Sequence, residues 1–305
     1  MITSRVLSII HNPIVDARRG TQLSKALGWN DPDMLARDYI RDVREASHSI
    51  VDYRIVERIE VDGFPVKADG FRYDVDTYLR CWRNRRGFHQ PDTVDYLALV
   101  RAFDLIGKVE SGQIDEVWLF GFPHAGYYES TMCGRGAFWC NSPPVAGTEH
   151  CARRFVIMGF NYERDVGCML EDLGHRAESI MARVYKGRRG DANLWERFSR
   201  YDQIAPGRAS VGNMHFAPNS ERDYDWGNSR NVPSDCDDWL NFPHPSAGSG
   251  QALRGTKRPV NSRDWGSGDM RRHHLWWFER LPHVEGETDG IHNNWWLYII
   301  DPNSI

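Results

Sequence analysis

The chain has 305 residues, of which 41% are hydrophobic and 26% charged, an ordinary composition for a globular protein of one large or two small domains. Its 38 basic and 42 acidic side chains give a formal charge of −4, which argues against nucleic-acid binding, because such binding needs a positive excess. No apolar run reaches the ~18 residues of a membrane span, so we expect neither nucleic acid nor a membrane as a partner.

The N-terminal residues 1–15 lack the long apolar core and the cleavage site of a secretory signal. We therefore expect a cytoplasmic protein if the chain is complete, and an extracellular one if a leader has been removed. Six cysteines occur without a CxxC pair, so no zinc ribbon or thioredoxin-like motif is present. Cys133 and Cys140 would form a bridge in an oxidising compartment; the alternative is free buried thiols.

Strand and helix patterns alternate over residues 1–202, which predicts an α/β fold: a single layered domain with a parallel or mixed central sheet. No GxGxxG or Walker-type loop follows the strands, so nucleotide binding has no support. In chain order, the pattern predicts a strand over 6–10, a helix opened by Asp31-Pro32, a strand over 51–61, a helix over 92–110, strands over 116–120 and 154–160, and a helix over 163–185.

Residues 203–305 are rich in Pro, Gly, Asn, Asp and Ser, yet eight of the twelve tryptophans lie after residue 190. A disordered tail would be poor in aromatic residues. We therefore predict an α/β core over 1–202 and an irregular, Trp-rich region over 203–305 that packs on this core and completes the same domain. Within it, residues 243–268 are predicted to form a long loop.

The segment 163–185 is predicted to be one helix with two faces, because its apolar residues recur at steps of three and four. Glu171, His175 and Glu178 share the other side, at i, i+4 and i+7. We predict His175 and Glu178 as metal ligands and Glu171 as a third ligand or general base. Zinc is the expected ion, because it accepts imidazole and carboxylate ligands. The alternative is a solvated face on which the two carboxylates pair with His175.

Small residues on that face indicate that another part of the chain covers it. Gly167, Gly174 and Ala182 stand where a solvated helix would prefer Lys, Gln or Glu. We expect the row to face protein rather than water. His215 is predicted to add a further metal ligand, after a short strand near Val211.

Polar and aromatic residues follow three of the predicted strands, where ligands bind in open α/β sheets. We predict catalytic carboxylates and substrate-binding groups at this edge; the alternative is ordinary loop chemistry. A metal-free mechanism would use two carboxylates about 5–10 Å apart, as in glycoside hydrolysis. The residues are His11 and Asn12 after the first strand, His124, Tyr127, Tyr128 and Glu129 after the strand at 116–120, and Asn161 and Glu163 after the strand at 154–160. Glu129 and Glu163 are predicted as the catalytic pair. His124, Tyr128 and Asn161 are predicted to bind substrate.

Paired tryptophans near the C-terminus stand beside histidines and amides, a composition typical of carbohydrate sites. Trp276 and Trp295 are predicted to contact a sugar. The alternative is an aromatic core under long loops.

The pattern His175-x-x-Glu178 followed by a distant histidine resembles the ligand pattern of zinc carboxypeptidases. The resemblance covers four residues, lies within a predicted helix rather than a loop, and has no matching arginine set for a terminal carboxylate. It implies a metal-dependent hydrolase. Together these features predict a hydrolase, with zinc as its expected cofactor, that acts on a polar polymer such as a peptide or polysaccharide; the alternative is a non-catalytic carbohydrate-binding protein that uses a Trp-rich surface.

Overall fold

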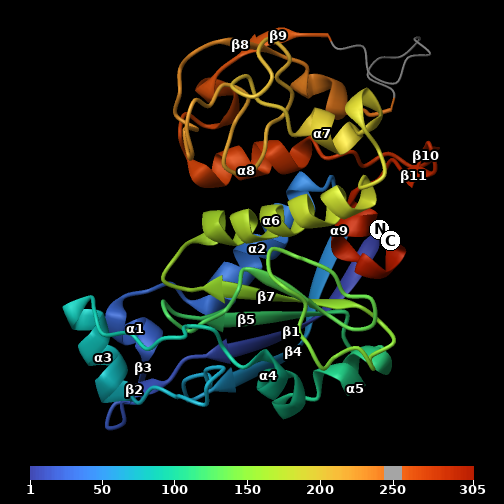
Figure 1. Cartoon of the computed structure of the whole chain (residues 1–305). Helices are drawn as coiled ribbons and strands as arrows, with labels where there is room; N and C mark the ends of the chain where they lie inside the picture. Colours follow the sequence, from blue (N-terminus) through green and yellow to red (C-terminus); the bar gives the residue numbers. More distant parts are fainter. Residues whose placement is uncertain (244–255) are drawn as a thin grey trace. The chain divides into compact units, whose positions relative to one another are not determined.

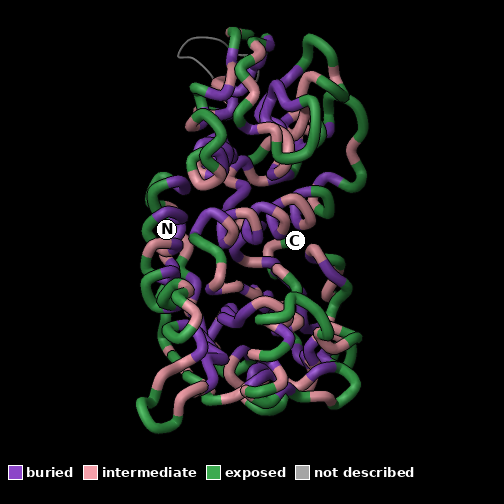
Figure 2. Tube along the Cα trace, turned by 90° about the vertical axis from the view of Figure 1, so that its left-hand side faces the viewer, coloured by how far each residue is buried: buried purple, intermediate pink, exposed green. Residues whose placement is uncertain are grey.

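The computed structural model describes residues 1–243 and 256–305, so part of the loop predicted over 243–268 lies outside the described residues. The described part contradicts a continuous loop, because residues 258–260 form a short strand and residues 262–265 a 3₁₀ helix. The chain clusters into two compact units. The first comprises residues 3–39 and 53–173, and the second comprises residues 1–2, 40–52 and 174–305. In both, buried stretches alternate along the chain with exposed loops (Figure 2).

The first unit is built on a five-stranded mixed sheet in the order β4-β1-β5-β7-β6 (Figure 1). β5 pairs in parallel with β1 and with β7, whereas the edge strand β6 is antiparallel to β7. The predicted α/β fold with a mixed central sheet is confirmed. The strands are β1 (Ile2–His11), β4 (Val51–Val61), β5 (Glu116–Gly121), β6 (Ser130–Cys133) and β7 (Phe155–Asn161).

Helices and two minor strands surround this sheet. Asp74 caps α3 by accepting a hydrogen bond from the backbone of Thr77, which satisfies one of the unpaired amides of its first turn. The elements are β2 (Ile14–Asp16), β3 (Thr21–Gln22), α1 (Leu23–Leu27), α2 (Pro32–Ala46), α3 (Val75–Asn84), α4 (Tyr96–Ala102), α5 (Leu105–Glu110) and α6 (Val166–Val184).

Both faces of the sheet are buried, as the short, continuously apolar strands predict. On one face, Leu7 and Val117 share a core with Leu99 of α4. On the other, Tyr39 of α2 packs edge-on against Trp118, with ring centroids 5.2 Å apart. Because β1, β5 and β7 are parallel, their carboxyl ends meet at one edge, where loops carry polar side chains.

The helix predicted over 92–110 is wrong as a single element, because it is broken into α4 and α5. Asp104 lies between them in a left-handed conformation, with a φ of 49°. Its carboxylate lies over Gly107, where an added Cβ would be 2.6 Å from Oδ2. The spacing of apolar residues continues across this break, so the periodic pattern does not indicate it. Asp92 and Thr93 precede α4 and line a cavity instead.

The second unit holds short elements joined by long connections, as predicted for an irregular region. The predicted strand near Val211 is wrong: Ala209 forms only an isolated bridge with Ser234, and Val211 lies in no strand. The elements are η1 (Gly190–Ala192), α7 (Leu194–Phe198), β8 (Val232–Ser234), η2 (Cys236–Trp239), β9 (Arg258–Val260), η3 (Ser262–Trp265), α8 (Met270–Glu279), β10 (Glu287–Thr288), β11 (Ile291–His292), α9 (Trp296–Ile300) and η4 (Pro302–Ser304).

Tryptophan side chains form the core of this second unit. The rings of Trp195, Trp239, Trp277 and Trp295 surround Phe198 at centroid distances of 5.2–5.6 Å. All five are buried, so the prediction of a packed, Trp-rich C-terminal region is confirmed. The boundary at residue 202 and the core shared with the α/β part stay predictions.

Among the described residues, no helix is both long and apolar enough to cross a membrane. All six cysteines are free thiols, and five of them are buried.

Candidate functional site

Helix α6 carries the predicted two faces. The helix runs from Val166 to Val184, within the predicted span of 163–185. The apolar stripe is buried and anchors the helix, with Val166, Met169, Leu170, Leu173, Ala177, Ile180 and Met181 at most 3% exposed.

The opposite face of α6 is covered by protein near its middle, as predicted. A Cβ added to Gly174 would lie only 1.8 Å from Sδ of Met214, so glycine is what allows this close approach. The side chain of His175 is 16% exposed. Ala182, by contrast, is exposed, so the cover does not extend to the end of the helix.

The contact at Gly174 brings His215 against His175. Their Nε2 atoms are 3.0 Å apart, and the two rings meet edge to face. Nδ1 of His175 lies 2.8 Å from a carboxylate oxygen of Glu178, and Nδ1 of His215 lies 3.0 Å from one of Asp223. Each ring therefore has a carboxylate on one nitrogen and the other ring on the second.

The carboxylate partners of His175 and His215 determine which ring nitrogen of each carries the proton. A carboxylate accepts a hydrogen bond, so it favours the tautomer in which Nδ1 carries the proton. Both Nε2 atoms then present lone pairs to each other at 3.0 Å, which is repulsive without a cation between them. Either a shared proton or a bound metal ion removes the repulsion. Two imidazole ligands on one tetrahedral zinc would be separated by about 3.4 Å, close to the observed distance.

A third donor stands one turn earlier on the same helix. Ligand atoms of Glu171, His175 and His215 all lie within 4.8 Å of one another. Glu178 is occupied differently: besides pairing with Nδ1 of His175, it accepts a hydrogen bond from the backbone of Met214 at 3.0 Å. It therefore fixes the loop that carries His215 as well as the ring of His175.

Tyr224 completes this group on its solvent side. Its hydroxyl is 3.2 Å from Nε2 of His215, and the residue is 51% exposed. Its backbone is left-handed, with a φ of 57°, a conformation that costs about 1 kcal/mol or more for a side chain of this type. A strained residue with an exposed hydroxyl beside two histidines is typical of a functional site.

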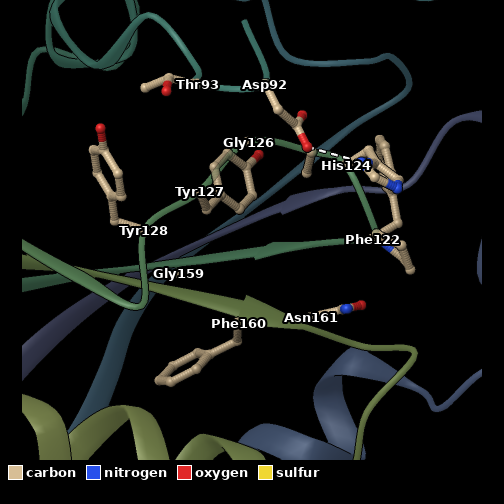
Figure 3. Close-up of a pocket in the computed structure, with 12 residues that line it drawn as sticks. Asp92, Thr93, Phe122, His124, Gly126, Tyr127, Tyr128, Gly159, Phe160 and Asn161 are labelled. Atoms are coloured by element: carbon tan, nitrogen blue, oxygen red, sulfur yellow. Dashed lines mark hydrogen bonds and ion pairs between the residues drawn. The ribbon is translucent and has the colours of Figure 1, made fainter. Parts of the chain in front are cut away.

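A second group of predicted residues lines a cavity at the carboxyl ends of β5 and β7 (Figure 3). The cavity measures about 320 Å³, within the range of small-molecule sites. His124, Tyr128 and Asn161, all predicted to contact substrate, lie together on its wall. Asp92 and Thr93 join them from the segment before α4.

Asp92 organises one wall of this cavity. One of its carboxylate oxygens is 2.8 Å from Nδ1 of His124 and the other is 2.6 Å from Nζ of Lys67. Lys67 is fully buried and also donates to the carbonyl of His124 at 2.6 Å. Burial lowers the pKa of Lys67, whereas its ion pair with Asp92 acts in the opposite direction.

The end of β1 reaches the same loop through His11. Nδ1 of His11 lies 2.7 Å from the hydroxyl of Tyr127, and the hydroxyl of Tyr162 donates to the carbonyl of His11. Burial, together with the positive charge of Arg72, lowers the pKa of His11 to about 4. The ring is therefore neutral at pH 7 and acts as a buried hydrogen-bond acceptor.

The two predicted catalytic carboxylates have different surroundings. Glu129 accepts a hydrogen bond from the amide of Asn141. Burial raises the pKa of Asp172 well above its ordinary value, and the negative charges of Glu129 and Glu171 add to the effect. Glu163 donates its backbone amide to Asn161 at 2.9 Å, and neither Glu129 nor Glu163 lines the cavity of Figure 3.

Trp276 and Trp295 are buried in the second unit, at 6% and 0% exposure. The guanidinium of Arg280 lies 4.0 Å above the ring of Trp276. Trp295 packs against Phe198. Neither ring presents a face to a ligand in this structure, because protein already covers it.

Sequence reasoning missed Asp223, Tyr224, Lys67 and Asp92. The periodic pattern predicts Asp92 at the start of a helix, where an Asp is an expected cap. Lys67 lies in an aperiodic loop, and a lysine there is normally solvated. Asp223 and Tyr224 follow His215 by eight and nine residues in a stretch without periodicity. Because a metal-binding histidine usually has a carboxylate partner, an acidic residue close to His215 in the chain is the sequence signal that indicates Asp223.

Comparison with known proteins gives no match: no family model, no curated protein and no solved structure is significantly similar to this chain.

Proposed function

We propose that this protein is a metal-dependent hydrolase whose zinc ion is bound by His175, His215 and Glu171. The observation that carries the proposal is the pair of Nε2 atoms 3.0 Å apart, each on a ring whose Nδ1 faces a carboxylate. Histidine ligands of metals usually have such a partner, which fixes the tautomer and makes the ring a stronger ligand.

The donor set fits zinc and leaves room for a reaction. Imidazole and carboxylate ligands suit Zn²⁺, and three protein ligands leave one position for water, as in catalytic zinc sites. When bound, the ion would lower the pKa of that water toward about 7 and polarise a substrate carbonyl. The side chain of His215 is 28% exposed, so substrate can reach this position from solvent.

The other residues of the group have separate roles in this proposal. Glu178 and Asp223 orient the two rings through their Nδ1 atoms. The hydroxyl of Tyr224, 3.2 Å from Nε2 of His215, would be placed to donate a hydrogen bond to a substrate carbonyl oxygen that develops negative charge. The predicted role of Glu178 as a direct ligand is replaced in the proposal by Glu171.

We infer a peptide as substrate rather than a glycan. Metal ions accelerate hydrolysis by polarising a carbonyl, which an amide has and a glycosidic bond does not. Glycoside hydrolysis normally uses two carboxylates instead. The alternative of a carbohydrate-binding protein with a Trp-rich surface has less support, because Trp276 and Trp295 are buried.

The test combines metal analysis with peptide hydrolysis. Purified protein is analysed for bound metal, titrated with Zn²⁺ after removal of metal, and assayed on a fluorogenic peptide library. We expect one zinc ion per chain and cleavage that a chelator stops and Zn²⁺ restores. His175→Ala and His215→Ala should lose zinc binding and peptide cleavage. The control His292→Ala, which removes a histidine 3.4 Å from Glu287, should keep both properties.

Each half of the proposal can fail separately. If neither histidine variant changed zinc affinity, the metal site would be wrong. If zinc bound as described but no peptide, ester or glycan were cleaved, the hydrolase assignment would be wrong and the centre would be a binding site only.

A further inference from the structure

We propose that the cavity at the carboxyl ends of β5 and β7 is a second ligand site, which takes a neutral, hydroxyl-rich molecule of the size of one sugar ring. It is formed by residues of the first unit alone and contains none of the proposed metal ligands. The inference therefore does not rest on the proposed function.

The shape of the cavity depends on two glycines that no other residue could replace. A Cβ on Gly126 would lie 2.0 Å from the carbonyl oxygen of Asp92, and one on Gly159 would lie 2.3 Å from that of Tyr128. Gly126 also has a φ of 92°, which L side chains rarely adopt. These close approaches hold the loop that carries His124 and Tyr128 tightly against the strand ends.

His124 is held in place at both its backbone and its ring. Its φ of 65° is uncommon for a residue with a side chain. Lys67 binds its carbonyl, Asp92 binds its Nδ1, and the ring of Phe88 stacks on it with centroids 3.6 Å apart. Burying a lysine is costly unless its charge is paired, and here Asp92 pairs with Lys67 at 2.6 Å, so the network can hold His124 in a fixed position. Such positioning is typical of a side chain that contacts a ligand.

The charge of the cavity indicates a neutral ligand. Lys67 and Asp92 form an ion pair at 2.6 Å, so their charges cancel within the wall. Among the residues that line the cavity, Asp92 and His124 alone are acidic or basic. An anion would need an unpaired positive group, and a cation would compete with Lys67 for Asp92.

The polar groups match hydroxyls. With Nδ1 of His124 donating to Asp92, Nε2 accepts a hydrogen bond from a ligand hydroxyl. The amide of Asn161, at the end of β7, uses its oxygen to accept from the backbone of Glu163, which leaves its NH₂ group as a donor (Figure 3). Thr93 and Tyr128, which both carry hydroxyls, also line the cavity; the ring of Tyr128 stacks on Tyr96 on one side and remains partly exposed. Donors, acceptors and one aromatic face are what a sugar ring requires.

The experiment measures binding of glucose, galactose, N-acetylglucosamine and myo-inositol by saturation-transfer NMR and calorimetry, with glucose 6-phosphate as the charged comparison. All measurements include a chelator, so that a metal site contributes nothing. His124→Asn keeps a donor for Asp92 and tolerates the left-handed backbone, but removes the acceptor Nε2. Asn161→Ala removes the amide. His150→Asn, at an exposed position of the same unit, is the matched control.

We expect at least one neutral compound to bind in the presence of chelator. His124→Asn and Asn161→Ala should each weaken its binding by roughly tenfold, the equivalent of one hydrogen bond, and the control should not change it. The inference is overturned if none of the four neutral compounds binds, if glucose 6-phosphate binds more tightly than all of them, or if both cavity variants bind as the wild type does. Absence of zinc binding would leave these results unaffected.

Discussion

At the scale of single residues, the two histidines of the candidate metal centre compete for one cation. With both Nδ1 atoms facing carboxylates, the two Nε2 atoms are close enough to bind a single cation between them, either a proton or a metal ion. Histidine binds a metal ion only in its deprotonated form, so we expect zinc affinity to rise with pH, as a zinc titration at a series of pH values would measure.

Substitution of the carboxylates distinguishes a ligand from an orienting group. Glu171→Gln should reduce zinc affinity most, because it removes a charged ligand. Glu178→Gln and Asp223→Asn should reduce it by about 10- to 100-fold, the usual effect of losing a partner of a ligating histidine. Competition with a chromogenic chelator measures all three, with Glu287→Gln as the control. A larger loss in Glu178→Gln than in Glu171→Gln would make Glu178 the ligand and contradict our assignment.

Burial of His11 makes the stability of the folded chain depend on pH. Its pKa is about 4 in the folded chain, below the ordinary 6.5, so the unfolded state takes up the proton first as the pH falls. The stabilising effect of the neutral ring is complete above about pH 6.5 and is lost on the way to pH 4, which corresponds to a loss of about 3 kcal/mol.

Urea unfolding at a series of pH values tests this. The wild type should lose about 3 kcal/mol more between pH 6.5 and 4 than His11→Gln, which retains an acceptor for Tyr127 but cannot be protonated. His150→Gln should follow the wild type. Parallel profiles for the wild type and His11→Gln would show that His11 does not titrate abnormally.

At the scale of elements, Gly174 allows the loop that carries His215 to pack closely against α6. Gly→Ala within a helix normally stabilises it by about 1 kcal/mol. Here the new methyl group would meet Met214 at 1.8 Å and push away the loop that carries His215. We expect Gly174→Ala to destabilise the fold by about 1–3 kcal/mol and to weaken zinc binding.

Gly187→Ala serves as the control for Gly174→Ala, and Met214→Ala as the compensating substitution. Gly187 lies just beyond α6 with no atom near its hypothetical Cβ, so Gly187→Ala should be tolerated. Met214→Ala removes the clashing sulfur, and the double variant should be more stable than the sum of the single effects predicts. Additive effects in a denaturant double-mutant cycle would mean that the two residues are not in contact.

The elements that the sequence predicted correctly are those with a strong local pattern. The apolar strands at 116–120 and 154–160 and the two-faced helix at 163–185 appear within a few residues of their predicted bounds. Small residues on α6 correctly indicated close contact near Gly174. The break at Asp104 and the missing strand near Val211 depend on single backbone conformations, which leave no periodic trace.

The candidate sites were predictable where their residues lie in elements with a strong local sequence pattern. The helix spacing placed Glu171, His175 and Glu178 in one row, and the strand ends gathered His124, Tyr128 and Asn161. Their partners lie far away in sequence: Asp223 approaches from an aperiodic loop, and Lys67 lies 57 residues before His124. A single sequence carries no information on such long-range pairs.

At the scale of the whole molecule, residues from the N-terminal half belong to the Trp-rich unit. Residues 40–52 cluster with 174–305 rather than with the sheet. Asp42 of α2, 3% exposed, receives two hydrogen bonds from Arg271 of α8, at 2.6 and 2.9 Å. The second unit therefore needs a segment that precedes most of the sheet in the chain.

Removal of this ion pair should destabilise the second unit. Among the residues that the structure describes, Arg271→Met leaves the buried carboxylate of Asp42 with Arg41 as its one ion-pair partner, at 3.3 Å, and we expect a loss of about 2–4 kcal/mol. The double variant Asp42→Asn, Arg271→Met should regain much of this loss, because the buried charge is then absent. Equal stability of all three proteins in chemical denaturation would show that the pair contributes nothing.

Because residues 40–52 belong to the second unit, we also predict the behaviour of a chain shortened to residues 1–202. It would retain Asp42 and the first turns of the second unit but lack Arg271 and three of the four tryptophans that surround Phe198. Phe198 and Trp195 would then expose apolar surface that costs about 25 cal/mol per Å². We expect this fragment to aggregate or to be digested, and limited proteolysis of the full chain near residue 203 to be followed by rapid loss of the N-terminal piece. A stable, folded fragment with a cooperative melting transition would show instead that the α/β part does not need residues 203–305, and the prediction of one shared core would be wrong.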